Sequence, residues 1–178
     1  MIEQSTTIRA QLISAQSVDR FEILFIEADE ANGYTFTADA LKDSVPLWEE
    51  CSVFVDHSPW GRSVRDLGGV LSNVGFNRKY NGLTATLRPC GPSAEIVREA
   101  ARLMLGDAPH PDLGFSADVI FLADAHNNVQ EIMQPLSVDL VVEPAFATGF
   151  IRQINQKGPH MKNANVQVSS QLSAKVPG

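Results

Sequence analysis

Alternating apolar and polar residues, the pattern of half-buried β-strands, recur along most of the chain. Runs of this kind, rich in β-branched and aromatic residues, predict seven strands. They cover residues 7–15, 20–28, 51–57, 68–76, 82–90, 113–122 and 129–144. The Asn81-Gly82 pair between two of these runs is a tight-turn signal, so we expect 68–76 and 82–90 to form a hairpin.

Two stretches have helical spacing instead. Thr37 is a suitable N-cap for a helix that begins near Ala38, and Pro46 should end that helix. Ser93 has the same place before a longer helix. The apolar residues expected on the buried face of this longer helix are Ile96, Val97, Ala100, Leu103 and Met104.

The order of these elements shows no βαβ alternation. It predicts a mostly β protein with flanking helices (α+β), built as a small closed or nearly closed antiparallel β-barrel of about seven strands. Residues 1–154 are expected to form this single domain. Residues 155–178 are rich in Ser, Asn, Gln and Lys and have no apolar face, so they are expected to be a flexible polar tail.

Charge and composition limit the classes of partner. The formal net charge of −7 argues against nucleic acid and against an anionic membrane surface. No apolar run approaches the ~20 residues of a membrane span. The N-terminal residues lack the basic and apolar regions of a signal peptide, and Cys51 and Cys90 lack metal-type spacing, so a cytosolic protein with reduced thiols is expected.

Two polar residues stand out in the last two predicted strands. In 113–122, Ser116 shares a strand face with Gly114 and opposes the apolar face. In 136–142, Asp139 likewise opposes the apolar face. Ser116 and Asp139 are therefore expected on the outward faces of neighbouring strands. His57, which ends the run "SVFVDH", has the parity of Val53, but it lies where that strand stops.

His57, Ser116 and Asp139 are the three residue types of a serine hydrolase: a base, a nucleophile and a group that orients the base. Residue types alone leave the choice open, with Asp118 and Glu143 as rival carboxylates. The remaining histidines are expected to be solvated; they are His110, His126 and His160. A metal site on Asp56 and His57 lacks nearby partners, so no metal is expected.

Four short motifs occur in an informative order: "GYTFTADAL", "VFVDHS", "LGFSADVIF" and "LSVDLVVEPAFATG". In this order they resemble the landmarks of the tailed-phage prohead (capsid maturation) proteases, which are themselves similar to the herpesvirus assemblins. The family pattern is a histidine closing a strand after the first helix, a serine in a Gly-x-Ser strand, and a signature strand followed by Pro-Ala. The resemblance covers roughly residues 20–150.

The resemblance implies that His57 is the general base and Ser116 the nucleophile. Assemblins use a second histidine as the third member, whereas this sequence offers Asp139 in the signature strand. The loop after that strand would bind the oxyanion, which points to the backbone amides of Ala147 and Thr148. No cofactor is implied.

The implied partners are the phage scaffold and major capsid proteins and the enzyme itself, inside an immature capsid in the host cytoplasm. Self-association is left open. In the tail, small residues around Ser173 suggest a self-cleavage site and a link to a scaffold region. Two other functions fit the same residues: a non-catalytic scaffold or assembly module, and a serine hydrolase of small esters. Two interpretations remain open for the loop after His57: its residues Trp60, Arg62 and Arg65 border a substrate groove, or they are ordinary exposed loop residues.

Overall fold

The computed structural model describes residues 19–58 and 60–154. The predicted strand at 7–15 and the whole of the predicted tail lie outside these residues. The expected self-cleavage site near Ser173 lies outside them as well.

The described residues contain nine strands and four helical segments. The strands are β1 (Arg20–Glu27), β2 (Glu30–Ala31), β3 (Tyr34–Phe36), β4 (Ser52–Val55), β5 (Leu67–Asn77), β6 (Gly82–Pro89), β7 (Leu113–Ala123), β8 (Asn128–Val142) and β9 (Gly149–Ile154). The helical segments are α2 (Ala38–Ser44), η1 (Val45–Trp48), η2 (Val64–Asp66) and α3 (Ala94–Leu105). Six of the nine strands match predicted runs. The sequence analysis missed β9 and the β2–β3 hairpin, whose turn residues Asn32 and Gly33 both have positive φ.

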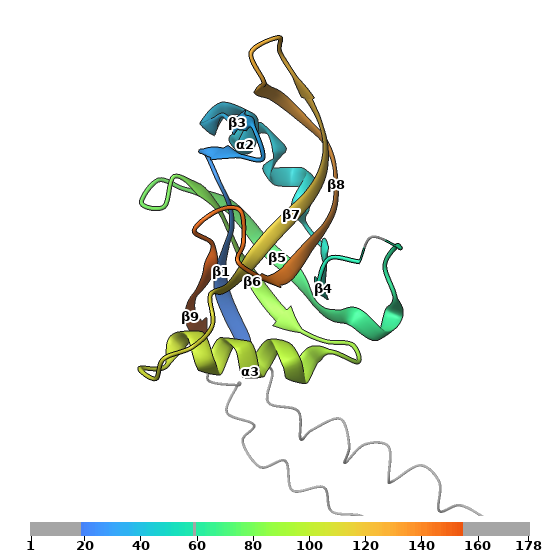
Figure 1. The fold of residues 1–178 in the computed structure, drawn as a ribbon, viewed down its shortest axis with the longest axis vertical. Coiled ribbons are helices and arrows are strands. Elements are labelled where there is room, and N and C mark those ends of the chain that lie inside the picture. The colour runs from blue at the N-terminus through green and yellow to red at the C-terminus, as the bar shows by residue number, and fades with distance from the viewer. Residues whose placement is uncertain (1–18, 59, 155–178) are drawn as a thin grey trace, which may run out of the picture.

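All nine strands belong to one strongly curled sheet, shown in Figure 1. Its order is β2-β3-β8-β4-β5-β6-β1-β9, and β7 pairs with β8. The prediction of a mostly β protein with flanking helices is confirmed, and so is the β5–β6 hairpin. The finer prediction, a closed or nearly closed antiparallel barrel of about seven strands, is wrong, because the sheet is an open half-barrel and β8 runs parallel to both β3 and β4.

The gap in the curled sheet lies between β7 and β9. A side chain bridges it where a strand ladder would be expected: Thr148 Oγ1 accepts from the Phe115 N–H at 2.8 Å and donates to the Phe115 carbonyl at 2.7 Å. Beneath this bridge the rings of Phe115 and Phe150 meet edge to face, with centroids 5.1 Å apart. Core packing therefore continues across the gap although the backbone ladder does not.

The helices cover the ends of the sheet. In α2 the Thr37 hydroxyl accepts from the Ala40 N–H at 3.2 Å, as a capping residue should. In α3, Ser93 occupies the N-cap position without capping, because its hydroxyl donates to the Arg65 carbonyl at 2.6 Å. The prediction of which α3 residues are buried is only partly correct. Val97 is fully buried, whereas Ile96 is 53% exposed.

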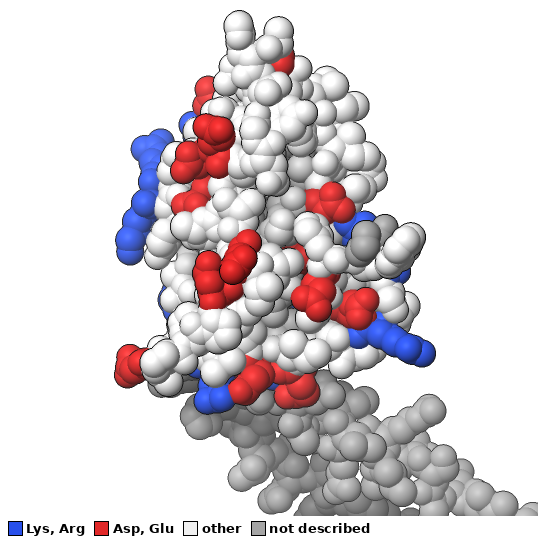
Figure 2. Space-filling model, viewed as in Figure 1, with Lys and Arg blue, Asp and Glu red and all other residues white. Residues whose placement is uncertain are grey.

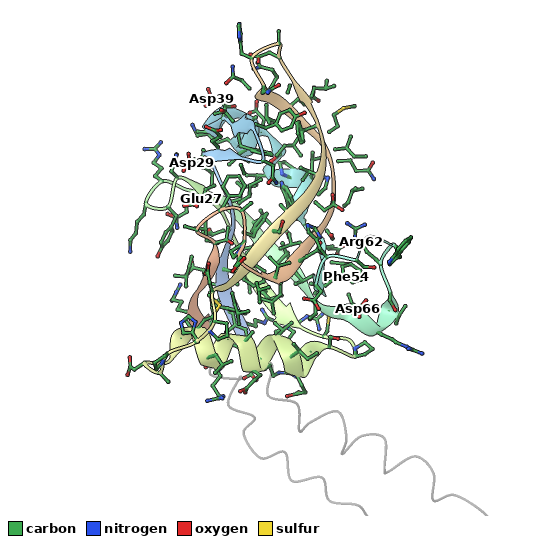
Figure 3. All side chains as sticks on the ribbon, viewed as in Figure 1. Glu27, Asp29, Asp39, Phe54, Arg62 and Asp66 are labelled. Atoms are coloured by element: carbon green, nitrogen blue, oxygen red, sulfur yellow. The ribbon has the colours of Figure 1, made fainter. Side chains whose placement is uncertain are left out.

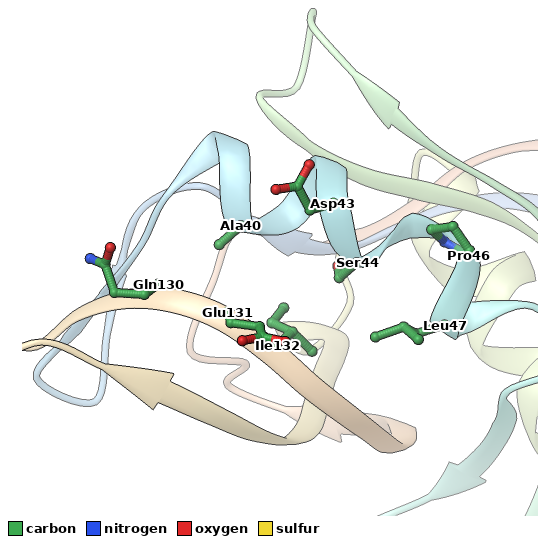
Figure 4. A pocket seen from close by; sticks show the side chains of 8 residues that line it. All are labelled: Ala40, Asp43, Ser44, Pro46, Leu47, Gln130, Glu131 and Ile132. Atoms are coloured by element: carbon green, nitrogen blue, oxygen red, sulfur yellow. The ribbon is translucent and has the colours of Figure 1, made fainter.

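Strand β8 has two kinds of neighbour. β7 pairs along one edge, and β3 and β4 share the other edge at its two ends. Between β3 and β4, α2 and η1 lie against β8 and leave a surface pocket of about 420 Å³, seen close up in Figure 4. Its lining residues are Ala40, Asp43, Ser44, Pro46, Leu47, Gln130, Glu131 and Ile132. None of the predicted site residues is among them.

Acidic side chains spread over the face of the molecule shown in Figure 2, with basic ones mainly at its margins. This distribution agrees with the negative net charge of the chain. In the described part of the chain, no helix is long and apolar enough to span a membrane.

Candidate active site

The predicted site residues meet around the C-terminal half of β8. Ser116 of β7 pairs directly with Asp139 of β8, and on the other side Phe54 of β4 pairs with Asp139. Directly paired residues of neighbouring strands point to the same face of a sheet. The three side chains therefore form a row across the outer face, as the alternation of Ser116 and Asp139 had predicted.

His57 reaches the same face because β4 ends just before it. Asp56 has φ = 65°, in the left-handed region, and its N–H donates to the Leu140 carbonyl at 2.9 Å. A residue with positive φ redirects the chain, so the strand alternation that would turn His57 inward with Val53 no longer applies. The tight bend at Asp56 thus places the imidazole above Asp139.

The three side chains form a continuous chain of contacts. The Asp139 carboxylate pairs with His57 Nδ1, and His57 Nε2 lies 3.3 Å from Ser116 Oγ. An ionised carboxylate only accepts hydrogen bonds, so Nδ1 carries the proton and Nε2 has a free lone pair facing the hydroxyl. The side chain of Asp139 is 4% exposed and that of His57 is 54% exposed. The base is thus reachable from solvent while its partner is not.

Further polar contacts hold the far side of Asp139. The Ser137 hydroxyl donates to Asp139 Oδ1 at 2.7 Å. The Arg62 guanidinium in turn donates to Ser137 Oγ at 2.6 Å and pairs with Asp118. Arg62 also lies over the Phe54 ring, 5.9 Å from its centroid, and both side chains are labelled in Figure 3.

These contacts surround a small hollow of about 30 Å³ beside the imidazole. Its lining residues are Phe54, Asp56, His57, Ser58, Arg62, Asp66, Asp118 and Asp139.

Burial raises the pKa of the Asp139 carboxyl above its ordinary value. The Ser137 hydrogen bond, the charge that His57 carries when protonated and the Arg62 guanidinium oppose this rise, and the nearby Asp118 carboxylate adds to it. The hydrogen bonds and cations around Asp139 therefore favour the ionised form that burial disfavours.

Cys51, just before β4, is close enough to Asp139 for the carboxylate charge to affect the thiol. Burial, reinforced by the Asp139 carboxylate, raises the pKa of the Cys51 thiol to about 11. At neutral pH this thiol is protonated and is a poor nucleophile. Ser116 is therefore the better candidate nucleophile in this part of the molecule.

The two amides expected to bind the oxyanion both donate to acceptors within the protein. The Ala147 N–H donates to Glu27 Oε2 at 2.9 Å, and the Thr148 N–H donates to the Phe146 carbonyl at 2.8 Å. Figure 3 shows Glu27 well apart from Arg62. The resemblance to the prohead proteases implied these two amides, and the fold gives both of them other acceptors.

The other candidates lie at the edge of the site or away from it. Glu143 is exposed just past the end of β8, and Asp118 is engaged by Arg62. His110 and His126 are exposed, as expected. His160 lies outside the described residues.

The loop between β4 and η2 is exposed as well. Trp60 is 95% exposed, and Arg65 is exposed within η2. Whether these two residues meet a substrate stays a prediction.

Sequence reasoning missed the contacts that Ser137 and Arg62 make. The spacing of Ser137 and Asp139, two residues apart on one strand, placed both on the same face and was a usable signal. Nothing in the sequence indicated that Arg62 folds back onto the outer face of β8, because that contact spans 75 residues of chain.

Within residues 19–58 and 60–154, no three side chains of His, Cys, Asp or Glu gather as metal ligands would. In comparisons with known proteins, no family model matches the chain and no curated protein matches its sequence.

Proposed function

We propose that the protein is a serine endopeptidase in which Ser116 is the nucleophile, His57 the general base and Asp139 the residue that orients His57. The observation that carries the proposal is the unbroken contact from Ser116 Oγ through the imidazole to the Asp139 carboxylate. These three side chains come from separate segments of the chain, and each has the orientation that its role requires.

The chemistry follows from the proton positions. Ser116 Oγ attacks the scissile carbonyl carbon while its proton passes to His57 Nε2, and the carbonyl oxygen becomes an oxyanion. The resulting imidazolium is stabilised by Asp139 through Nδ1–H. His57 then gives the proton to the leaving amine, and an acyl-enzyme remains. A water molecule, deprotonated by His57, hydrolyses the acyl-enzyme and restores Ser116.

An extended peptide fits the surroundings of Ser116. Both backbone polar groups of Phe115 contact Thr148 and so point away from β8. By alternation, those of Ala117 point the same way. Within the described residues β7 pairs with β8 alone, so beyond Phe115, from Ala117 onward, this edge of β7 has no partner strand. A substrate strand can hydrogen-bond to such an edge, which favours a peptide over a small ester.

The substrate class proposed here comes from the order of the sequence motifs. We propose that the enzyme belongs to the prohead-protease type and processes scaffold and capsid proteins, and itself, inside an immature phage capsid. The support is that His57, Ser116 and Asp139 fall on three of the four motifs that resemble this family. A reaction of this kind needs neither metal nor cofactor.

The test is covalent labelling with a fluorophosphonate, which reacts with activated serine hydroxyls. Wild-type protein should be labelled at Ser116, as located by mass spectrometry of its peptides. Ser116→Ala should abolish the label, and cleavage of a denatured capsid-protein substrate should fall by on the order of 10⁴.

A matched control is Ser72→Ala, which removes a hydroxyl from β5, away from the site. This variant should be labelled like the wild type. Wild-type protein that is folded but neither labelled nor active would contradict the proposal and favour an assembly module. Labelling with turnover of esters but not of peptides would favour a small-ester hydrolase.

A further inference from the structure

Arg62 and Ser137 extend the chain of contacts beyond the three residues that would carry out the reaction. Arg62 lies in the loop after His57 and folds back over the outer face of the sheet. It donates to Ser137 Oγ at 2.6 Å, and Ser137 Oγ lies 2.7 Å from Asp139 Oδ1. Ser137 is completely buried, so its hydroxyl cannot exchange these partners for water.

The direction of these hydrogen bonds follows from the chemistry of the donor. A guanidinium has five N–H donors and no acceptor. Ser137 Oγ must therefore accept from Arg62, which leaves the single proton of its hydroxyl for Asp139 Oδ1. A carboxylate that accepts on Oδ1 from Ser137 and on Oδ2 from His57 is satisfied as an anion. The proton on His57 then belongs on Nδ1.

Arg62 makes two further contacts, although its side chain is 35% exposed. It pairs with Asp118 on β7 and lies over the Phe54 ring on β4. These two residues belong to the strands on either side of β8, so the guanidinium spans the three strands that build the site. An arginine held in this way can set the orientation of a neighbour more strictly than a mobile lysine would.

We propose that Arg62, acting through Ser137, is a positioning residue that fixes the Nδ1–H tautomer of His57 and so keeps Nε2 free to accept the Ser116 proton. The inference deepens the proposed function and rests on it. Arg62 has no contact with the reacting atoms, and its effect passes through Ser137 and Asp139. Without the Arg62 donor, the Ser137 hydroxyl can rotate, and Asp139 loses a fixed hydrogen bond.

The test compares Arg62→Met, Ser137→Ala and the double variant by two measurements. The first is the ¹⁵N NMR spectrum of His57, recorded where the imidazole is neutral, which reports the tautomer directly. The second is the rate of fluorophosphonate labelling at Ser116. Each single variant should shift His57 from one tautomer toward a mixture and slow labelling by on the order of 10- to 100-fold.

The double variant should be no slower than the slower single variant, because both substitutions break one path. Arg65→Met is the matched control, since it removes an exposed arginine from η2, just after the same loop. It should leave both the tautomer and the labelling rate unchanged. A general loss of positive charge would affect Arg65→Met and Arg62→Met alike.

An unchanged His57 tautomer in both single variants would overturn the inference, and so would additive losses in the double variant. Thermal unfolding of each variant identifies any protein that fails to fold, and Ser137→Ala tests the path without touching the loop. If wild-type protein were not labelled at all, the proposed function would fail, and the tautomer comparison would still decide the role of Arg62.

Discussion

The two faces of β8 near its C-terminal end are equally buried and chemically opposite. On the inner face, Val138 and Leu140 are 0% and 4% exposed and pack into the core. On the outer face, Ser137 and Asp139 are 0% and 3% exposed and form polar contacts with the loop after β4. One four-residue stretch thus belongs both to the core and to the candidate site.

The difference shows that burial has opposite energetic consequences on the two faces. Removing apolar side chains from water stabilises the fold. Removing a carboxylate from water costs free energy unless hydrogen bonds and charges compensate. The raised pKa of Asp139 indicates that the compensation is incomplete. The inner face therefore contributes stability, and the outer face holds a carboxylate where the proposed reaction needs it.

Phe115→Ala, on the inner side of β7, should have the largest effect on stability. Phe115 is completely buried and packs against Phe150. Its removal leaves a cavity and should lower the free energy of unfolding by about 3–5 kcal/mol. Denaturant unfolding measures this. The neighbouring outer-face variant Ser116→Ala should leave that free energy nearly unchanged, so a similar loss in both would contradict the division between the two faces.

Asp139→Asn should lower activity and leave the fold intact. An asparagine amide would face His57 Nδ1 as a donor and favour the wrong tautomer, so labelling of Ser116 should fall by on the order of 10³. Glu143→Gln, at an exposed carboxyl just past the end of the same strand, is the control and should be labelled at the wild-type rate.

The energetic cost of burying the Asp139 carboxylate should appear in the pH dependence of stability. The pKa of Asp139 is higher in the folded than in the unfolded protein. Its contribution to the free energy of unfolding is therefore fully present below the ordinary carboxyl pKa of about 3.9, and it is lost as the pH rises through the pKa of the folded state. His57, Arg62, Asp118 and Cys51 are the titratable groups around it. The free energy of unfolding of wild type minus that of Asp139→Asn should therefore decrease from acid to neutral pH. An increase over that range would contradict the argument.

Thr148→Val should destabilise the fold less than Phe115→Ala does. It removes the hydroxyl that satisfies both backbone groups of Phe115 and should destabilise the fold by about 1–3 kcal/mol. Thr148→Ser keeps the hydroxyl and should recover most of that loss. Unfolding curves of the two variants distinguish the hydrogen bonds from the packing of the methyl group. A larger loss in Thr148→Ser than in Thr148→Val would contradict this, because it would mean that the methyl group stabilises the fold more than the hydroxyl does.

Much of the fold could be predicted from local patterns. Alternation located six strands, and it placed Ser116 and Asp139 on outward faces, because strand periodicity depends only on neighbouring residues. The Thr37 cap and the stop at Pro46 are local in the same way. The contact of Thr148 with Phe115 across the gap in the sheet could not be predicted, since it joins residues 33 positions apart in the chain.

The remaining parts of the site depend on the backbone and on distant contacts. His57 turns outward because Asp56 adopts a positive φ, a conformation that Asp tolerates but that its presence does not dictate. The amides of Ala147 and Thr148 looked available, and their actual acceptors come from Glu27 and Phe146. No pattern of neighbouring residues encodes such pairings.

The parallel pairing of β4 with β8 has a consequence for folding kinetics. His57 and Ser116 are 59 residues apart in sequence, and Asp139 comes later still. Pairings between distant segments form slowly, because the intervening chain must lose entropy before the contact forms. During synthesis, a ribosome-bound chain whose β8 has not yet emerged lacks the strand that joins β4 to β7. We therefore expect the contact from Ser116 through His57 to Asp139, and with it the proposed activity, to appear abruptly once β8 has docked.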